Sequence, residues 1–164
     1  MIYKCSYNND FYLSIMQNNC SGYFAINKIF LYLLYPNLNM HEEIKNWWKQ
    51  AEADLHSSEN SLNSKDYYVS AFMSQQAVEK ALKALVLKEK NELIKTHNIS
   101  KLAKLLNLPN DLLIKISTLE PVYQETRYPD VSSKIPSEEF EEKDAVEFFN
   151  IATEVIEWIR KRIN

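Results

Sequence analysis

The sequence is poor in glycine and cysteine, and each shortage narrows the possible functions. One glycine in 164 residues excludes the phosphate-binding loops and dinucleotide fingerprints that need several glycines for close backbone approach. It also disfavours hairpin-rich β folds, because primed turns need residues that accept positive φ. Two cysteines make no disulfide framework, which fits a reducing cytoplasm. A net charge of −3 gives no general attraction to nucleic acid or to an anionic membrane.

Residues 1–39 differ in composition from the rest of the chain. They hold Cys5, Cys20 and Gly22, whereas from Met40 onward Glu, Lys, Leu and Ala recur with helical spacing. The apolar stretch 29–35 is far shorter than the ~20 residues that span a bilayer. Three interpretations of this N-terminal extension are open: a true, poorly ordered element, a targeting segment, or upstream sequence included by a start site placed too early. We favour the third, and expect the folded domain at residues 40–164.

Residues 40–164 predict an all-α fold, an up-and-down bundle of four main helices plus one short helix. Apolar residues at three- and four-residue steps predict main helices over 41–62, 66–90, about 110–121 and from Ser137 onward, with the short helix ending near Asn107. The seam of the second main helix is Ala71, Val78, Leu82 and Leu85, and that of the last is Ala145, Phe148, Ala152, Val155 and Ile159. Residues 124–137 show no helical period, and a connection that long is often functional.

Polar residues at the predicted boundaries suggest how these helices begin and end without glycine. Asn63, Asn91 and Asn107 are predicted to take the left-handed conformation that closes a helix C-terminus. Ser64 or Asp66 is expected to cap the second main helix, and Ser137 the last one.

The most distinctive motif lies at residues 74–84, which read Ser-Gln-Gln-Ala-Val-Glu-Lys-Ala-Leu-Lys-Ala. At 3.6 residues per turn, Gln76, Glu79, Lys80 and Lys83 share roughly 100° of the helix. One interpretation is a solvated face supported by i,i+4 ion pairs. The other is a functional face on which Lys80 and Lys83 neutralise phosphate and Glu79 orients a lysine.

A second motif lies in the predicted loop, where Arg127 stands between Tyr123 and Tyr128. A guanidinium suits phosphate or carboxylate, and either tyrosine could stack on a base. The alternative is structural, with Arg127 tying the loop to a helix carboxylate such as Asp54 or Glu79.

His97 is interpreted as a cap or a ligand of a loop carbonyl before it is considered as a catalytic residue. The spacing of His, Cys and acidic residues suggests no zinc site, and no nucleophile or acid–base pair stands out. We therefore expect no metal, no cofactor and no catalytic residue, with His97 the weak candidate should there be one.

Together these motifs resemble the HEPN family (higher eukaryotes and prokaryotes nucleotide-binding). The resemblance rests on Trp47 or Trp48 with Asp54, on residues 75–84, on Thr96-His97-Asn98, and on Tyr123 with residues 126–130, and it covers residues 40–164. It implies a helical bundle that commonly dimerises. Small prokaryotic members often act with a minimal nucleotidyltransferase, in several cases as toxin–antitoxin pairs.

Many members of that family are metal-independent ribonucleases marked by an arginine, four to six residues and a histidine. Here the positions before His97 that would hold the arginine are Lys90, Asn91 and Glu92. Our first expectation is therefore a cytoplasmic, dimeric nucleotide- or RNA-associated partner of a minimal nucleotidyltransferase, with no membrane contact. Its candidate binding residues are Lys80, Lys83, Arg127, Tyr123 and Tyr128, supported by Asp54, Gln76 and Glu79. A purely structural partner is the second interpretation, and a divergent ribonuclease using His97 with Lys90 or Arg127 is the third.

Overall fold

The computed structural model describes residues 36–131 and 134–163. Contacts between Cα atoms divide the chain into Met1–Asn39 and Met40–Asn164, and the second part is the helical domain. The predictions about residues 1–39 fall almost wholly outside the described residues and stay predictions.

The described residues fold into helices and contain no strand, which confirms the all-α class. The long helices are α3 (Pro36–Asn63), α4 (Tyr67–Lys90) and α9 (Glu142–Ile163). Between α4 and α9 lie the shorter α5 (Ile99–Leu105), α6 (Asn110–Leu119), α7 (Val122–Glu125) and α8 (Pro136–Glu139). Within the described part of the chain, no helix is long and apolar enough to cross a lipid bilayer.

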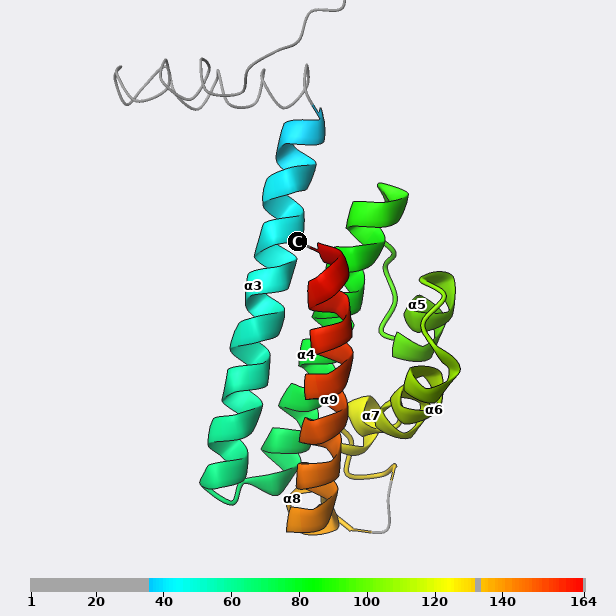
Figure 1. Ribbon diagram of the computed structural model, residues 1–164. Helices are drawn as coiled ribbons and strands as arrows, with labels where there is room; N and C mark the ends of the chain where they lie inside the picture. Colours follow the sequence, from blue (N-terminus) through cyan, green and yellow to red (C-terminus); the bar gives the residue numbers. More distant parts are fainter. Residues whose placement is uncertain (1–35, 132–133, 164) are drawn as a thin grey trace, which may run out of the picture. The chain divides into compact units, whose positions relative to one another are not determined.

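The up-and-down bundle consists of α3, α4, a third segment made of α5, α6 and α7, and α9 (Figure 1). Helix α3 descends, α4 ascends beside it, α5, α6 and α7 lie on the other side of α4, and α9 ascends again. The third segment consists of short helices. The left-handed Asn107, at φ 53°, and then Pro109 separate α5 from α6. Helix α4 is central, as its apolar composition predicts, since it packs against α9, α5, α7 and α8 and hydrogen-bonds to α3 through Ser58.

The predicted seams form the core. Every residue named for α4 is fully buried, as are Ala145, Ala152, Val155 and Ile159 of α9. Phe148 is only partly buried at the margin of the same cluster. The repeat of apolar residues therefore identified the buried face of each of these two helices correctly.

Two of the three predicted left-handed residues are confirmed. Asn91 and Asn107 have φ values of 60° and 53°. The prediction for Asn63 is wrong, because α3 continues through it and Lys65 takes the left-handed conformation, at φ 66°. The Lys65 N–H then donates to the Leu62 carbonyl at 3.1 Å, closing a Schellman-type end.

The predicted N-caps agree less well with the structure. Asp66 stands at the N-cap position of α4, but its side chain makes no capping hydrogen bond. Ser137 does not cap the last helix, because residues 136–139 form the separate turn α8 and Phe140 is extended and buried. Helix α9 begins at Glu142, and the Asp144 carboxylate accepts the Glu141 N–H at 2.9 Å. The helical turns α7 and α8 also shorten the connection expected over 124–137.

Candidate nucleotide-binding surface

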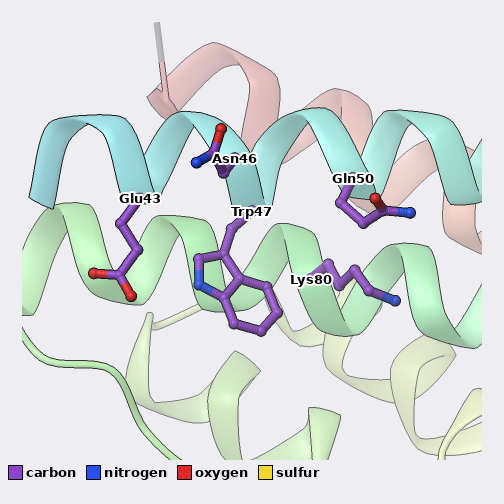
Figure 2. Close-up of a pocket in the computed structure, with 5 residues that line it drawn as sticks. All are labelled: Glu43, Asn46, Trp47, Gln50 and Lys80. Carbon is purple, nitrogen blue, oxygen red and sulfur yellow. The ribbon is translucent and has the colours of Figure 1, made fainter. Parts of the chain in front are cut away.

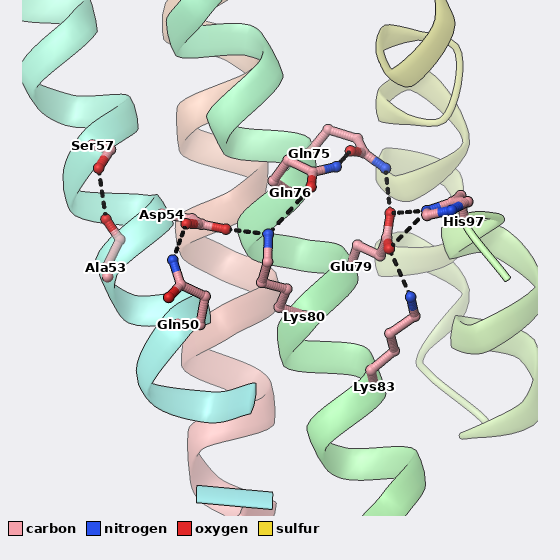
Figure 3. A network of polar contacts seen from close by, with 10 residues as sticks. All are labelled: Gln50, Ala53, Asp54, Ser57, Gln75, Gln76, Glu79, Lys80, Lys83 and His97. Atoms are coloured by element: carbon pink, nitrogen blue, oxygen red, sulfur yellow. Dashed lines mark hydrogen bonds and ion pairs between the residues drawn. The ribbon is translucent and has the colours of Figure 1, made fainter. Parts of the chain in front are cut away.

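Glu79 and Lys83 of the polar arc of α4 are buried, and Gln76 and Lys80 are partly buried, so the interpretation of the arc as a solvated face is wrong. Glu79 is 4% exposed, Lys83 7% and the neighbouring Gln75 fully buried. Figure 3 shows this face between α3 on one side and His97 on the other, with α9 behind α4. Buried charges are costly unless they are paired and hydrogen-bonded. The structure meets that condition with a network that crosses the face.

The α3 half of the network is centred on Asp54. Its carboxylate accepts a hydrogen bond from the Gln50 amide at 2.7 Å and forms an ion pair with the Lys80 ammonium. Lys80 also donates to the side-chain oxygen of Gln76 at 3.2 Å. Lys80 is therefore held between α3 and α4, and its charge is compensated by Asp54.

The other half is centred on Glu79. Its carboxylate accepts from Lys83 Nζ at 2.8 Å, from His97 Nδ1 at 3.0 Å and from Gln75 at 3.4 Å. An ionised carboxylate can only accept, so the His97 proton lies on Nδ1 and the ring presents Nε2 away from Glu79. Gln76 donates to Gln75 at 2.7 Å and joins the two halves. One chain of contacts thus runs from Gln50 to His97 (Figure 3).

An aromatic and cationic stack continues from His97. The His97 ring lies on Tyr123, with centroids 4.8 Å apart and an interplanar angle of 19°. The Arg127 guanidinium lies 4.2 Å from the Tyr123 centroid and 4.9 Å from that of Phe72. We call His97, Tyr123 and Arg127 the stacked surface. Rings and a guanidinium in this arrangement are suited to a base and a phosphate.

The structural interpretation of Arg127 predicted an ion pair with Asp54 or Glu79, and that prediction is wrong. Asp54 and Glu79 are engaged by lysines, and no carboxylate among the described residues forms an ion pair with Arg127. Aromatic rings hold the guanidinium instead. Tyr128, the other predicted stacking residue, is 50% exposed and makes no ring contact within the described residues. The predicted site residues thus separate into a buried network, the stacked surface and an exposed tyrosine.

Three residues that contact the network or the stacked surface were not among the site residues predicted from the sequence. Trp47 lies beneath Lys83, whose ammonium is 5.2 Å from the indole centroid, and Gln50 and Phe72 make the contacts described above. Helical spacing could have found them. Trp47, Gln50 and Asp54 fall at i, i+3 and i+7, one face of a helix, and Phe72 precedes Glu79 by two turns.

A hollow opens beside Trp47, on the α3 side of the network. Its lining is Glu43, Asn46, Trp47, Gln50 and Lys80, as shown in Figure 2. It encloses about 390 Å³ with its open mouth included. Because Gln50 and Lys80 line it, the hollow adjoins the Asp54 half of the network directly.

The Glu125 carboxyl, on α7, is affected by a neighbouring carboxylate. Burial, and then the negative charge of Glu139, raises the pKa of the Glu125 carboxyl above its usual value. Glu139 Oε2 is itself buried without a hydrogen-bond partner among the described residues. Nowhere in the described ranges do three or more His, Cys, Asp or Glu side chains gather as a metal-binding group.

Fold and site define an all-helical bundle whose polar side chains, in place of a glycine loop, line the candidate site. The chain belongs to the HEPN family, since residues 44–162 match the HEPN domain. It is similar to the crystal structure of ST0689, an archaeal HEPN homologue, with 36% identity and a TM-score of 0.65 over 74% of this chain and 98% of that one. It is also similar to TT1696 from Thermus thermophilus, with 29% identity and a TM-score of 0.66 over 72% of this chain and 96% of that one. No curated protein matches the chain.

Proposed function

We propose that this HEPN protein is a dimeric module that binds a nucleotide or RNA at the stacked surface and acts with a minimal nucleotidyltransferase, in a toxin–antitoxin-like or regulatory pair. The observation that carries the binding proposal is Arg127. Its guanidinium rests on Tyr123 and has no carboxylate partner among the described residues. Family membership supports the partner half of the proposal.

The stacked surface offers the ligand one group of each needed kind. Arg127 supplies a fixed positive charge for a phosphate oxygen. The exposed His97 ring, which lies on Tyr123, supplies ring area for a base. The role proposed from the sequence for Lys80 and Lys83 changes, because both ammonium groups are paired with carboxylates. In this proposal they hold the network in place, and Arg127 makes the phosphate contact.

Calorimetric titration with ATP, GTP and a short single-stranded RNA tests the binding proposal. A hydrogen bond to a charged group contributes about 1.5–3 kcal/mol, so we expect Arg127→Gln to weaken binding about 10- to 150-fold. The matched control is Arg160→Gln, because Arg160, like Arg127, lies over an aromatic ring: its guanidinium is 5.8 Å from the Trp48 centroid. The control should leave affinity unchanged. No measurable heat with any of the three ligands would remove the binding proposal.

The partner proposal needs its own measurement. Co-expression with a minimal nucleotidyltransferase from the same host should yield a complex that survives gel filtration, and sedimentation should give a dimer of this chain. A monomer that fails to associate with that enzyme would contradict it.

A divergent ribonuclease is the second candidate, favoured by the Glu79–His97 pair. A carboxylate that fixes a histidine tautomer is a common way to prepare a general base. This hypothesis predicts metal-independent RNA cleavage that leaves a cyclic phosphate and is lost in His97→Ala. Intact RNA after long incubation with excess protein would argue decisively against it.

A further inference from the structure

The His97 ring is held with one nitrogen engaged and the other exposed. Its Nδ1 donates to Glu79 Oε1 at 3.0 Å (Figure 3), and its Nε2 makes no hydrogen bond to any residue that the structure describes. The side chain is 61% exposed. A proton added to this ring from solvent therefore goes to Nε2, on the exposed side, and leaves the hydrogen bond to Glu79 in place.

The Glu79 carboxylate accepts a positive charge on His97 without cancelling it. The same oxygen, Oε1, also accepts from Lys83 Nζ at 2.8 Å, so the ammonium already balances the carboxylate. An imidazolium would raise the net charge of these three groups from zero to +1. Two segments adjoin the ring, residues 95–101 and 120–127, and their other charged or titratable side chains are Lys95, Lys101, Glu120, Tyr123, Glu125 and Arg127.

A charge on His97 would act on the ligand proposed for Arg127. The imidazole centroid lies 4.8 Å from the Tyr123 centroid, and the Arg127 guanidinium lies 4.2 Å from the same point. The imidazole and the guanidinium are therefore at most about 9 Å apart. That separation is within the Debye length, which is about 10 Å at 0.1 M salt. A phosphate at Arg127 would therefore also interact with an imidazolium at His97.

Histidine is the side chain whose charge ordinarily changes between pH 5 and 8. We propose that His97 is a pH-dependent switch of the stacked surface: its protonation adds a second cation beside Arg127, and phosphodiester ligands then bind more tightly at acidic pH. Because such coupling is reciprocal, binding of the ligand takes up protons from solvent in the same pH range. This inference rests on the proposed function and adds its regulation by pH.

Fluorescence anisotropy with a 3′-labelled tetra-adenylate that has a 5′-hydroxyl tests the switch. Its phosphodiesters keep their charge between pH 5.5 and 8, whereas a terminal phosphate, with a second pKa of about 6, would not. An exposed ion pair and a hydrogen bond to a charged group bracket the contribution of the imidazolium, so we expect about 5- to 12-fold tighter binding at pH 5.5 than at pH 8. The slope of log affinity against log salt concentration should change from about −0.7 at pH 8 to about −1.4 at pH 5.5, because a second cation then releases a counterion.

His97→Phe keeps a ring beside Tyr123 and removes the titrating nitrogen. This variant should bind equally at the two pH values, with a slope near −0.7 at both. The matched control is His56→Phe, because His56 is also exposed and also lies beside a carboxylate, that of Glu59 at 3.8 Å. The control should retain the pH dependence of the wild type.

Glu125→Gln tests another source of pH dependence. Burial, and then the charge of Glu139, raises the pKa of the Glu125 carboxyl, so its protonation would also make this part of the surface less negative as the pH falls. The variant should keep the pH dependence of the wild type. If the dependence disappears in Glu125→Gln, the switch is not His97.

Calorimetry covers the case in which His97→Phe fails to fold. Titrations at pH 6.5 in two buffers of different ionisation enthalpy should show net proton uptake by the wild type and none by His97→Gln, which keeps a donor for Glu79. Wild-type affinity that does not change with pH, or a pH dependence that persists in His97→Phe, overturns the switch and leaves the proposed function standing. No binding at either pH overturns both proposals.

Discussion

The dependence of binding on salt distinguishes the phosphate contacts expected from the sequence from those proposed above on the basis of the ion pairs. Each phosphate neutralised on a single strand contributes about −0.7 to the slope of log affinity against log salt concentration. With Lys80, Lys83 and Arg127 all on phosphates the slope would be about −2.1. The structure pairs both lysines with carboxylates, so we expect only Arg127 to release a counterion, and a slope near −0.7.

The two slopes differ enough to measure. Between 50 and 200 mM salt, a slope of −0.7 weakens binding by about 2.6-fold and a slope of −2.1 by about 18-fold. Fluorescence anisotropy with a labelled tetra-adenylate at three salt concentrations resolves the two. Arg127→Gln should bring the slope near zero, whereas Lys104→Gln, an exposed lysine on α5, should leave it unchanged. A wild-type slope near −2 that falls by about 0.7 in Lys80→Gln would refute the reasoning.

Three further predictions concern the stability of the described domain, each measured by urea denaturation. Glu79→Gln leaves the Lys83 ammonium buried without a charged partner, so it should lower the free energy of unfolding by about 3–5 kcal/mol. Replacing both residues with leucine should lower it by less than the single change does. An additive effect of the two replacements would contradict the pairing. Asp144→Ala should lower the free energy of unfolding by about 0.3–1 kcal/mol, because this carboxylate lies in the first turn of α9 and accepts the backbone N–H of Glu141. Ser137→Ala should change it by less than about 0.5 kcal/mol, and the reverse order would show that Asp144 does not stabilise the start of α9. Glu125→Gln should raise stability at pH 7, because the raised pKa of Glu125 means that its ionised form is disfavoured on folding. The gain should shrink as pH falls through the raised pKa of the folded state and vanish below the ordinary pKa of a glutamate; a gain that does not depend on pH would contradict this origin.

The repeat of apolar residues along the sequence predicted the helices and their buried faces. Where packing between helices fixes the backbone, as at the start of α9, the sequence pattern gave the wrong boundary. The apolar repeat located the buried seam of α4 at Val78 and Leu82 because helical periodicity depends only on neighbouring residues. The predicted start of α9 was wrong because Phe140 is buried against Phe148, with ring centroids 6.3 Å apart. That contact extends the chain just where Ser137 would have begun the helix. Tertiary burial overrode a good local cap signal.

In the candidate site, too, the sequence pattern predicted which residues share a helix face and did not predict their partners on other elements. Periodicity grouped Glu79, Lys80 and Lys83 on one face of α4, and that grouping holds. Their partners lie on other elements: Lys80 pairs with α3 through Asp54, and Glu79 reaches His97. Which carboxylate meets which cation depends on helix separation and rotation, and a single sequence contains neither directly. The predicted partner of Arg127 was wrong for this reason.

A bundle of this size has no need to bury Asp54, Glu79 and Lys83 for stability alone. Replacing such pairs with apolar residues of similar volume is often neutral or stabilising, and α4 already carries a continuous apolar seam. The network does, however, determine where other groups lie: Glu79 fixes both Lys83 over the Trp47 ring and the His97 ring on Tyr123. Glycine-loop proteins hold their ligands with backbone N–H groups, whose positions follow from the fold. A helical domain must fix side chains instead, and the ion-pair network on the central helix does so for Lys83 and His97 through Glu79. We infer that this network is retained because it positions the binding groups.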